Sequence, residues 1–169
     1  MTDITNKNFL SPINFRFAIK RAPHVNFFVQ GVNLPGLSLP DIDVSNPLIR
    51  VPYPGDHLLY DELDLSFKVD EDLKNYMEIH EWLRALGKRS YDEYKTLTQK
   101  TSTTGETIRS DMTLTVLTSN RNANYSVTFK DAFPIKLSGI NFDVTSSDVD
   151  YVPASATFRY VTYDVTKVI

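Results

Sequence analysis

The chain has no cysteine, only six glycines and a single tryptophan. Disulfides and thiolate metal sites are therefore excluded, so the fold depends on packing alone and suits a reducing compartment. No stretch approaches the roughly 18 consecutive apolar residues of a membrane span. The N-terminus also lacks the basic-then-apolar pattern of a signal peptide. We expect a protein that is soluble and intracellular when it is made.

A surplus of basic charge is also missing. Eighteen Lys and Arg face twenty-one Asp and Glu, which gives a net charge of -3. A dedicated nucleic-acid binder would show a clustered basic surplus, although a protein that nucleic acid merely passes would not. With 169 residues, 41% of them hydrophobic, the chain is long enough for one domain with a buried core, spanning residues 1–169.

Convergent catalytic groups are absent from the sequence pattern. His24, His57 and His80 share no metal-ligand spacing, and the glycines are too scattered to form a phosphate-binding loop. The acidic residues between 61 and 72 fit the polar face of a strand followed by the start of a helix. We therefore expect no enzyme, no catalytic residue, no cofactor and no metal site.

Alternation of apolar and polar residues is the dominant positive signal. It predicts strands with one buried face, most clearly at 63–69, where Leu63, Leu65 and Phe67 alternate with polar residues. The same reasoning predicts further strands at 13–19, 25–32, 112–116, 125–129, 135–144 and 154–165, with a hairpin turn at 119–124.

One helix is predicted over about 71–86. Asp70 would cap its start and Gly87 would take the left-handed position at its end. Its apolar positions follow helical spacing, so it should lie against a sheet. They are Leu73, Tyr76, Met77, His80, Leu83 and Leu86, widened by Ile79 and Trp82.

The segment 34–58 fits neither pattern. Five prolines between 35 and 54 exclude a central strand, so we expect an extended arm or an edge hairpin. Its apolar side chains lack an obvious face within the subunit, and we expect them to contact a neighbouring copy or ring. They are Leu37, Leu39, Ile42, Leu48, Ile49, Val51 and Tyr53. The alternative is an arm that folds back on its own domain.

Three other segments complete the outline. Residues 90–108 are polar and predict a mobile loop. Residues 1–10 form an N-terminal arm, and this arm and residues 167–169 are further candidates for contacts between rings.

The order of these elements resembles the tail tube protein family of contractile-tailed, T4-like bacteriophages, which is related in fold to type VI secretion tube proteins. The resemblance is carried by NFL at 8–10, NFRF at 14–17, VNLPG at 32–36, RVPYPGD at 50–56, LDLSF at 63–67, Trp82, VTFKDAFP at 127–134 and ATFRY at 156–160. It implies a mainly β fold, an antiparallel β-sandwich or barrel with one helix and a long Pro-rich arm. Residues 90–108 have no counterpart in the family pattern.

The resemblance implies a structural virion protein of the tail, assembled in the host cytoplasm. Copies would form hexameric rings that stack into the inner tail tube, with the tail sheath, baseplate hub and tail terminator proteins as partners. DNA would pass through the lumen without specific binding, because each neutralised phosphate would add affinity. The polar strand faces are the candidates for its lining, namely Glu62, Asp64, Ser66, Lys68, Thr113 and Thr115.

Two alternatives remain open at this point. A baseplate hub, a tube initiator or a tube terminator would share the fold but form a single ring. A monomeric β-sandwich binding module would instead carry an aromatic site around Tyr60, Tyr91 and Tyr94.

Overall fold

The computed structural model describes residues 9–45, 47–87, 91–92, 94–96, 108–142 and 151–168. Sheet A has the strand order β1-β8-β9-β11, with the bounds Phe15–Ile19, Ser110–Leu117, Ala123–Leu137 and Thr162–Lys167. Sheet B continues in the order β9-β10-β7-β2, where β10 is Pro153–Arg159, β7 is Leu63–Lys68 and β2 is Val29–Val32. The predicted fold class, mainly β and antiparallel, is confirmed, although these strands do not close into a barrel.

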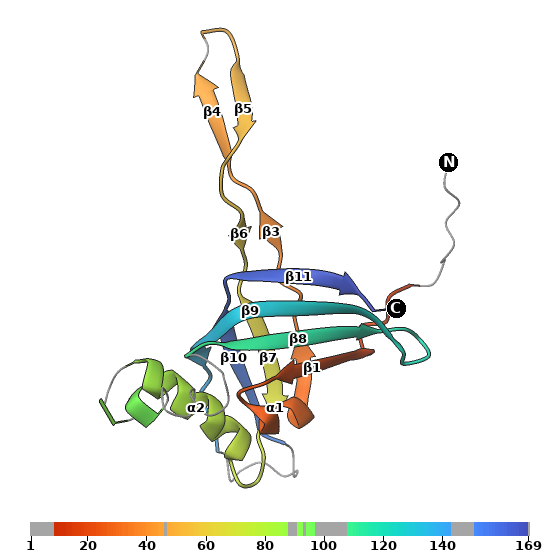
Figure 1. Ribbon diagram of the computed structural model, residues 1–169, viewed down its shortest axis with the longest axis vertical. Helices are drawn as coiled ribbons and strands as arrows, with labels where there is room; N and C mark the ends of the chain where they lie inside the picture. Colours follow the sequence, from red (N-terminus) through yellow and green to blue (C-terminus); the bar gives the residue numbers. More distant parts are fainter. Residues whose placement is uncertain are drawn as a thin grey trace.

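The two sheets are joined because β9 is long and bends. Residues 123–132 of β9 pair with β8, whereas residues 133–137 pair with β10. At the bend Asp131 has a φ of 55°, and its N–H donates to Asp111 Oδ1 at 3.2 Å. β10 and β11 pair with β9 on either side of this bulge. Sheets A and B are thus the two halves of one bent antiparallel sheet (Figure 1).

Both halves turn their apolar side chains toward one core. The alternation predicted at 63–69 is confirmed, because Leu63, Leu65 and Phe67 are buried while Asp64 and Ser66 are exposed. The residues of this core that are less than 2% exposed and apolar are Ile19, Ala22, Val25, Leu63, Leu65, Phe67, Ile79, Met112, Val127, Phe129, Ala132, Ala156 and Phe158.

The long helix α2, Lys74–Leu86, exists as predicted but starts later than expected. Asp70 does not cap it. Leu73 occupies the N-cap position with a φ of 57°, and the Asp70 carbonyl accepts its N–H. Gly87 ends the helix with a φ of -69°, so the left-handed conformation expected there was wrong. The buried face is centred on Ile79 and Trp82 rather than on the stripe predicted from Leu73 to Leu86.

The strand predicted at 25–32 was wrong in its first half. Pro23–Phe28 forms the short helix α1, with proline in its first turn, and only Val29–Val32 extends into β2. Val25 lies on this helix and is fully buried in the core. An apolar residue at this position therefore reflects burial of the helix and not a strand. No described helix has the length and hydropathy needed to cross a bilayer.

The C-terminal half differs from the prediction in where strands break. The strands expected at 125–129 and 135–144 are one strand as far as Leu137, followed by non-strand residues to 142. The strand expected at 154–165 is split into β10 and β11 by Tyr160 and Val161, opposite the bend in β9. The hairpin turn between β8 and β9 is confirmed, and Thr118 and Asn122 close it by a 2.8 Å backbone hydrogen bond.

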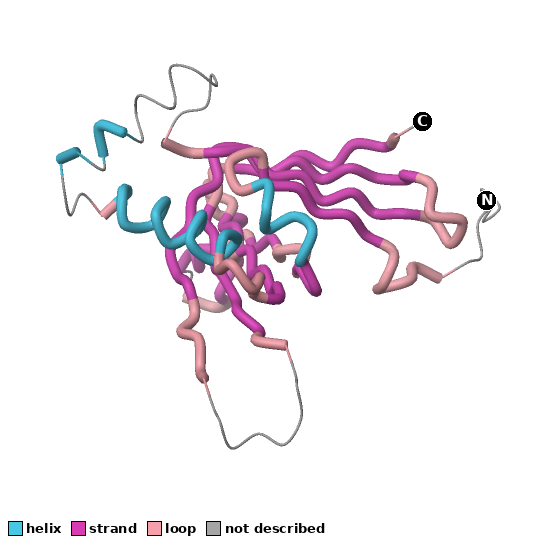
Figure 2. The backbone as a smooth tube through the Cα atoms, turned by 90° about the horizontal axis from the view of Figure 1, so that it is seen from below, coloured by secondary structure: helices cyan, strands magenta, loops and turns pink. Residues whose placement is uncertain are grey.

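The two ends of sheet A are covered unequally. Figure 2 shows the helices gathered beside one part of the sheet, while the strand ends near the carboxyl end of β11 extend past them. The core therefore lies under only part of sheet A, and the remainder projects from the body.

Candidate assembly surfaces

The Pro-rich segment forms a two-part hairpin that rises from the body as its longest projection (Figure 1). At its root β3, Leu37–Ser38, pairs with β6, Leu59–Tyr60. Beyond them β4, Asp41–Ser45, pairs with β5, Arg50–Pro54. We call residues 37–60 the arm. All seven predicted contact side chains are exposed, from 38% for Val51 to 91% for Leu48.

The outer part of the arm has one apolar and one polar face. Directly paired residues of antiparallel strands point to the same side, and sides alternate along each strand. Ile42 pairs with Tyr53 and Val44 with Val51, which makes one face apolar. The opposite face carries Asp41, Asp43, Ser45, Arg50, Pro52 and Pro54. An apolar face of this kind, exposed to water on a projecting hairpin, is typical of a binding surface.

Three tyrosines hold the root of the arm, and the sequence analysis did not predict that they come together. The rings of Tyr60, Tyr160 and Tyr163 lie 5.7–6.0 Å apart in edge contacts. The Tyr160 hydroxyl donates to the Asp61 carbonyl at 2.9 Å, and the Tyr163 hydroxyl donates to the Pro35 carbonyl at 3.4 Å. The residues that flank the two root strands are thereby bonded to the C-terminal part of the chain. The three tyrosines fix the direction in which the arm leaves the body.

Burial raises the pKa of Tyr160 to about 12, with smaller contributions from Tyr163, Asp61 and Tyr60. Its ordinary value is 10.0. The folded protein therefore holds this proton more tightly than the unfolded chain does. The stabilisation is fully present below about pH 10 and is lost as the pH rises through the interval up to about pH 12.

We expect the Tyr160→Phe variant to lose part of the alkaline sensitivity of the wild type. Without the titrating hydroxyl, the free energy of unfolding should fall less steeply between pH 10 and 12. Urea unfolding at a series of pH values measures this slope. Tyr53→Phe, on the exposed face of the arm, is the matched control for the removal of a tyrosine hydroxyl. An unchanged slope in Tyr160→Phe would contradict the assignment.

The six side chains predicted to line a lumen lie on two different surfaces. Glu62, Asp64, Ser66 and Lys68 belong to β7 or the residue before it in sheet B, whereas Thr113 and Thr115 belong to β8 in sheet A. Because both strands turn their apolar residues into the same core, their polar residues face outward from separate sheets. The structure does not bring the six together, and their role in a lumen stays a prediction.

Each of the two outer faces has a distinct composition. On sheet B, Glu62 accepts from Arg159 at 3.2 Å and Asp64 accepts from the Thr157 hydroxyl at 2.7 Å. On sheet A, Thr113 and Thr115 pair with Thr128 and Ser126, giving a hydroxyl-rich surface. Charged side chains on that surface pair with opposite charges, Lys130 with Asp164 and Lys20 with Asp111.

The histidines occupy separate places in the described structure. His24 bonds to Glu78 at 2.5 Å, His80 stacks on Tyr76, and His57 lies in the arm. Within the residues that the structure describes, no three His, Asp or Glu side chains gather as metal ligands. Absence of catalysis stays a prediction.

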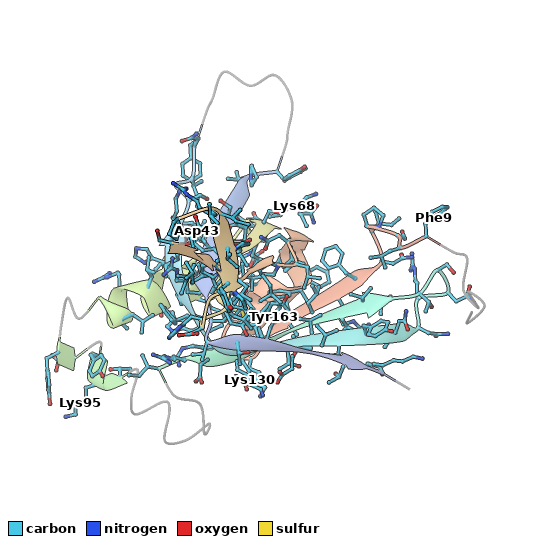
Figure 3. All side chains as sticks on the ribbon, turned by 90° about the horizontal axis from the view of Figure 1, so that it is seen from above. Phe9, Asp43, Lys68, Lys95, Lys130 and Tyr163 are labelled. Atoms are coloured by element: carbon cyan, nitrogen blue, oxygen red, sulfur yellow. The ribbon has the colours of Figure 1, made fainter. Side chains whose placement is uncertain are left out.

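The aromatic site of the binding-module alternative is not assembled. Tyr60 belongs to the arm root, whereas Tyr91 and Tyr94 follow α2. Figure 3 labels Lys95, next to Tyr94, far across the view from Tyr163, which contacts Tyr60. Most of the predicted loop 90–108 lies outside the described residues, as do residues 1–8 of the N-terminal arm and residue 169.

The family model described as "Phage tail tube protein" matches residues 5–166, nearly the whole chain. The chain belongs to the phage tail tube protein family. The resemblance found in the sequence is thereby confirmed, and the protein is a component of a phage tail. Assembly in the host cytoplasm stays a prediction.

Three individual proteins that resemble this tail tube family protein are named as terminators or as a terminating cap. The tail tube terminator protein of Enterobacteria phage T4 is 30% identical over 142 residues, which cover 82% of this chain and 76% of that protein. The cap that terminates the anti-feeding prophage tube has a similar fold, with a TM-score of 0.63, 14% identity and coverage of 99% and 97%. A sheath/tube terminator of the PVC extracellular contractile injection system also has a similar fold. Its TM-score is 0.61 and its sequence identity is 15%, with 95% of this chain and 99% of that chain covered.

Proposed function

We propose that this tail tube family protein is a tail tube terminator, the ring that closes the end of the inner tube of a contractile tail. The observation that carries the proposal is the 30% identity to the phage T4 tail tube terminator across most of both chains. The fold likeness to two terminating proteins agrees with it, although at 14% and 15% identity it supports the fold alone. Our sequence analysis favoured the major tube subunit and kept the terminator as an alternative, and the comparisons support the alternative better.

Ring formation is part of the proposal. β1 and β11 are the edge strands of sheet A, and an edge strand carries backbone groups available for pairing with another chain. Association of copies would cover such edges, and a closed ring would cover all of them. By the family resemblance we propose hexameric rings, which contact the tail tube on one side and associate with the sheath or its terminator.

The role is architectural and has no catalytic step. DNA would pass the ring during ejection, so its lining should not hold phosphate. A surface of hydroxyls, or one whose charges are paired as on the outer face of sheet A, meets this requirement better than a basic surface. The outer face of sheet B would also avoid holding phosphate, because its Glu62 and Asp64 carboxylates repel the negative charge of DNA.

Adding the purified protein to assembling major tube subunits tests the proposal. We expect tubes that stop growing, each carrying the protein at one end only, as seen by electron microscopy with a gold-labelled chain. A major subunit would instead enter the tube along its whole length. An initiator would increase the number of tubes rather than limit their length, and either result would reject a terminator.

A further inference from the structure

The sheet A residues that project past the core leave an apolar surface uncovered. Residues paired across sheet A share a face, so each row can be followed from strand to strand. In one row Ile19, Met112 and Phe129 are all fully buried. In the next row Val165 is already 54% exposed, although it pairs with the buried Val127.

The row after that lies still farther from the core. It contains Phe15, Val116, Tyr125 and Lys167, and Tyr125 is 41% exposed. These side chains point to the same side as the core residues. Phe15 packs against the edge of the core and Val116 is half-buried, whereas Tyr125 and Val165 are exposed. We call the surface of Phe15, Val116, Tyr125 and Val165 the overhang.

We infer that the overhang receives the apolar face of the arm from a second copy of this chain. Both surfaces are parts of antiparallel strands with apolar side chains on one side, so they can pack face to face. The inference deepens the proposed function, on which it rests, by naming the contact that joins neighbouring copies.

Charge supports this pairing of surfaces. The arm contains Asp41, Asp43 and Asp56 against a single Arg50, a net charge of -2 with His57 neutral. The strand ends around the overhang, residues 9–17, 114–127 and 165–168, contain basic residues and no acidic residue. The basic residues are Arg16, Arg121 and Lys167. Opposite charges around an apolar contact speed association and disfavour wrong partners.

The arm does not reach the overhang of its own chain. The tyrosines at the root hold it in a direction away from the projecting strand ends (Figure 1). Viewed along the arm, Asp43 lies over the body, whereas Phe9, just before the overhang, lies at the far side (Figure 3). The contact must therefore be made between copies. Because it joins two different surfaces, it repeats from copy to copy and closes into a ring when the rotation allows.

Cysteine cross-linking tests the inference. The natural chain has no cysteine, so no native thiol can form an unintended disulfide. Val44→Cys places a thiol on the apolar face of the arm, and Val165→Cys places one on the overhang. A disulfide requires the two Cα atoms to approach within about 7 Å. The double variant should oxidise into a ladder of multimers, in solution or when bound to the end of a tube.

Mixing the two single variants should give cross-linked dimers and nothing larger, since each copy then has one thiol. The matched control combines Asp43→Cys, on the polar face of the arm, with Thr166→Cys, on the outer face of β11, and should not cross-link. A disulfide within one chain, or equal cross-linking in the control, would overturn the inference. Tube capping by the reduced double variant is measured separately and reports on the proposed function.

Discussion

Excision of residues 41–54, with an Asn-Gly turn joining Pro40 to Gly55, is expected to yield a folded protein that no longer forms rings. The Gly55 N–H donates to the Pro40 carbonyl at 2.7 Å, so the two ends of the excised hairpin already lie side by side. An Asn-Gly pair favours the two-residue turn that such ends require. The root strands β3 and β6 and the three tyrosines remain in place.

The expected separation of folding from assembly follows from exposure. Every residue of β4 and β5 is exposed, so removing them takes little apolar area from the core. The free energy of unfolding should change by less than about 1 kcal/mol, as for other surface changes. Sedimentation velocity should show a monomer at concentrations where the intact protein is oligomeric, and tube ends should no longer be capped.

A second excision variant provides the control for loop shortening in general. Deleting Gly139, an exposed loop residue after β9 that lies outside the arm and the overhang, should leave assembly intact. If the arm-deleted protein unfolds instead, the arm serves its own domain, as the alternative in the sequence analysis supposed. If it still forms rings, the arm is not the contact between copies.

The features that could be predicted from the sequence are those with a local cause. Leu63, Leu65 and Phe67 alternate with polar residues because one face of a strand is buried, and this period depends on adjacent residues only. The arm could also be predicted from the sequence, because proline is excluded from central strands. Exposed apolar residues between prolines therefore indicated an unusual surface before the fold was known.

The features that were missed depend on contacts between distant residues. Val25 looked like a strand residue, but Pro23 starts a helix that buries it against the core. The bend at Asp131 lies opposite the break between β10 and β11, which divides the strand predicted at 154–165. Tyr60 and Tyr163 are far apart in the chain, so their contact at the arm root became visible only in the structure.

The start of α2 depends on a buried polar side chain that the sequence analysis did not identify, and it leads to the largest expected change in stability. Asn75 is fully buried and bonds in three directions. Its Oδ1 accepts from the Tyr76 N–H at 2.7 Å and from the Asp70 N–H at 3.1 Å, and its Nδ2 donates to the Lys68 carbonyl at 2.7 Å. One side chain thus joins the end of β7, the following turn and the first turn of the helix.

Asn75→Ala should lower the free energy of unfolding by about 3 kcal/mol. Each lost hydrogen bond contributes about 1 kcal/mol, and a buried backbone group left without a partner adds to the loss. Urea unfolding measures the change, with Lys74→Ala as the control. Lys74 precedes Asn75 on the same helix, but its side chain is exposed and pairs with exposed Asp72, so its removal should leave the free energy of unfolding nearly unchanged.

The outcome of Asn75→Ala also bears on assembly. α2 supplies Ile79 and Trp82 to the core that supports both sheets, whereas the arm and the overhang lie elsewhere on the body. The variant should therefore still cap tubes at low temperature, and lose capping at the temperature where it unfolds. Loss of capping while the protein remains folded would mean that the first turn of α2 itself contacts a neighbour. In that case the surfaces assigned to assembly would have to extend to this helix.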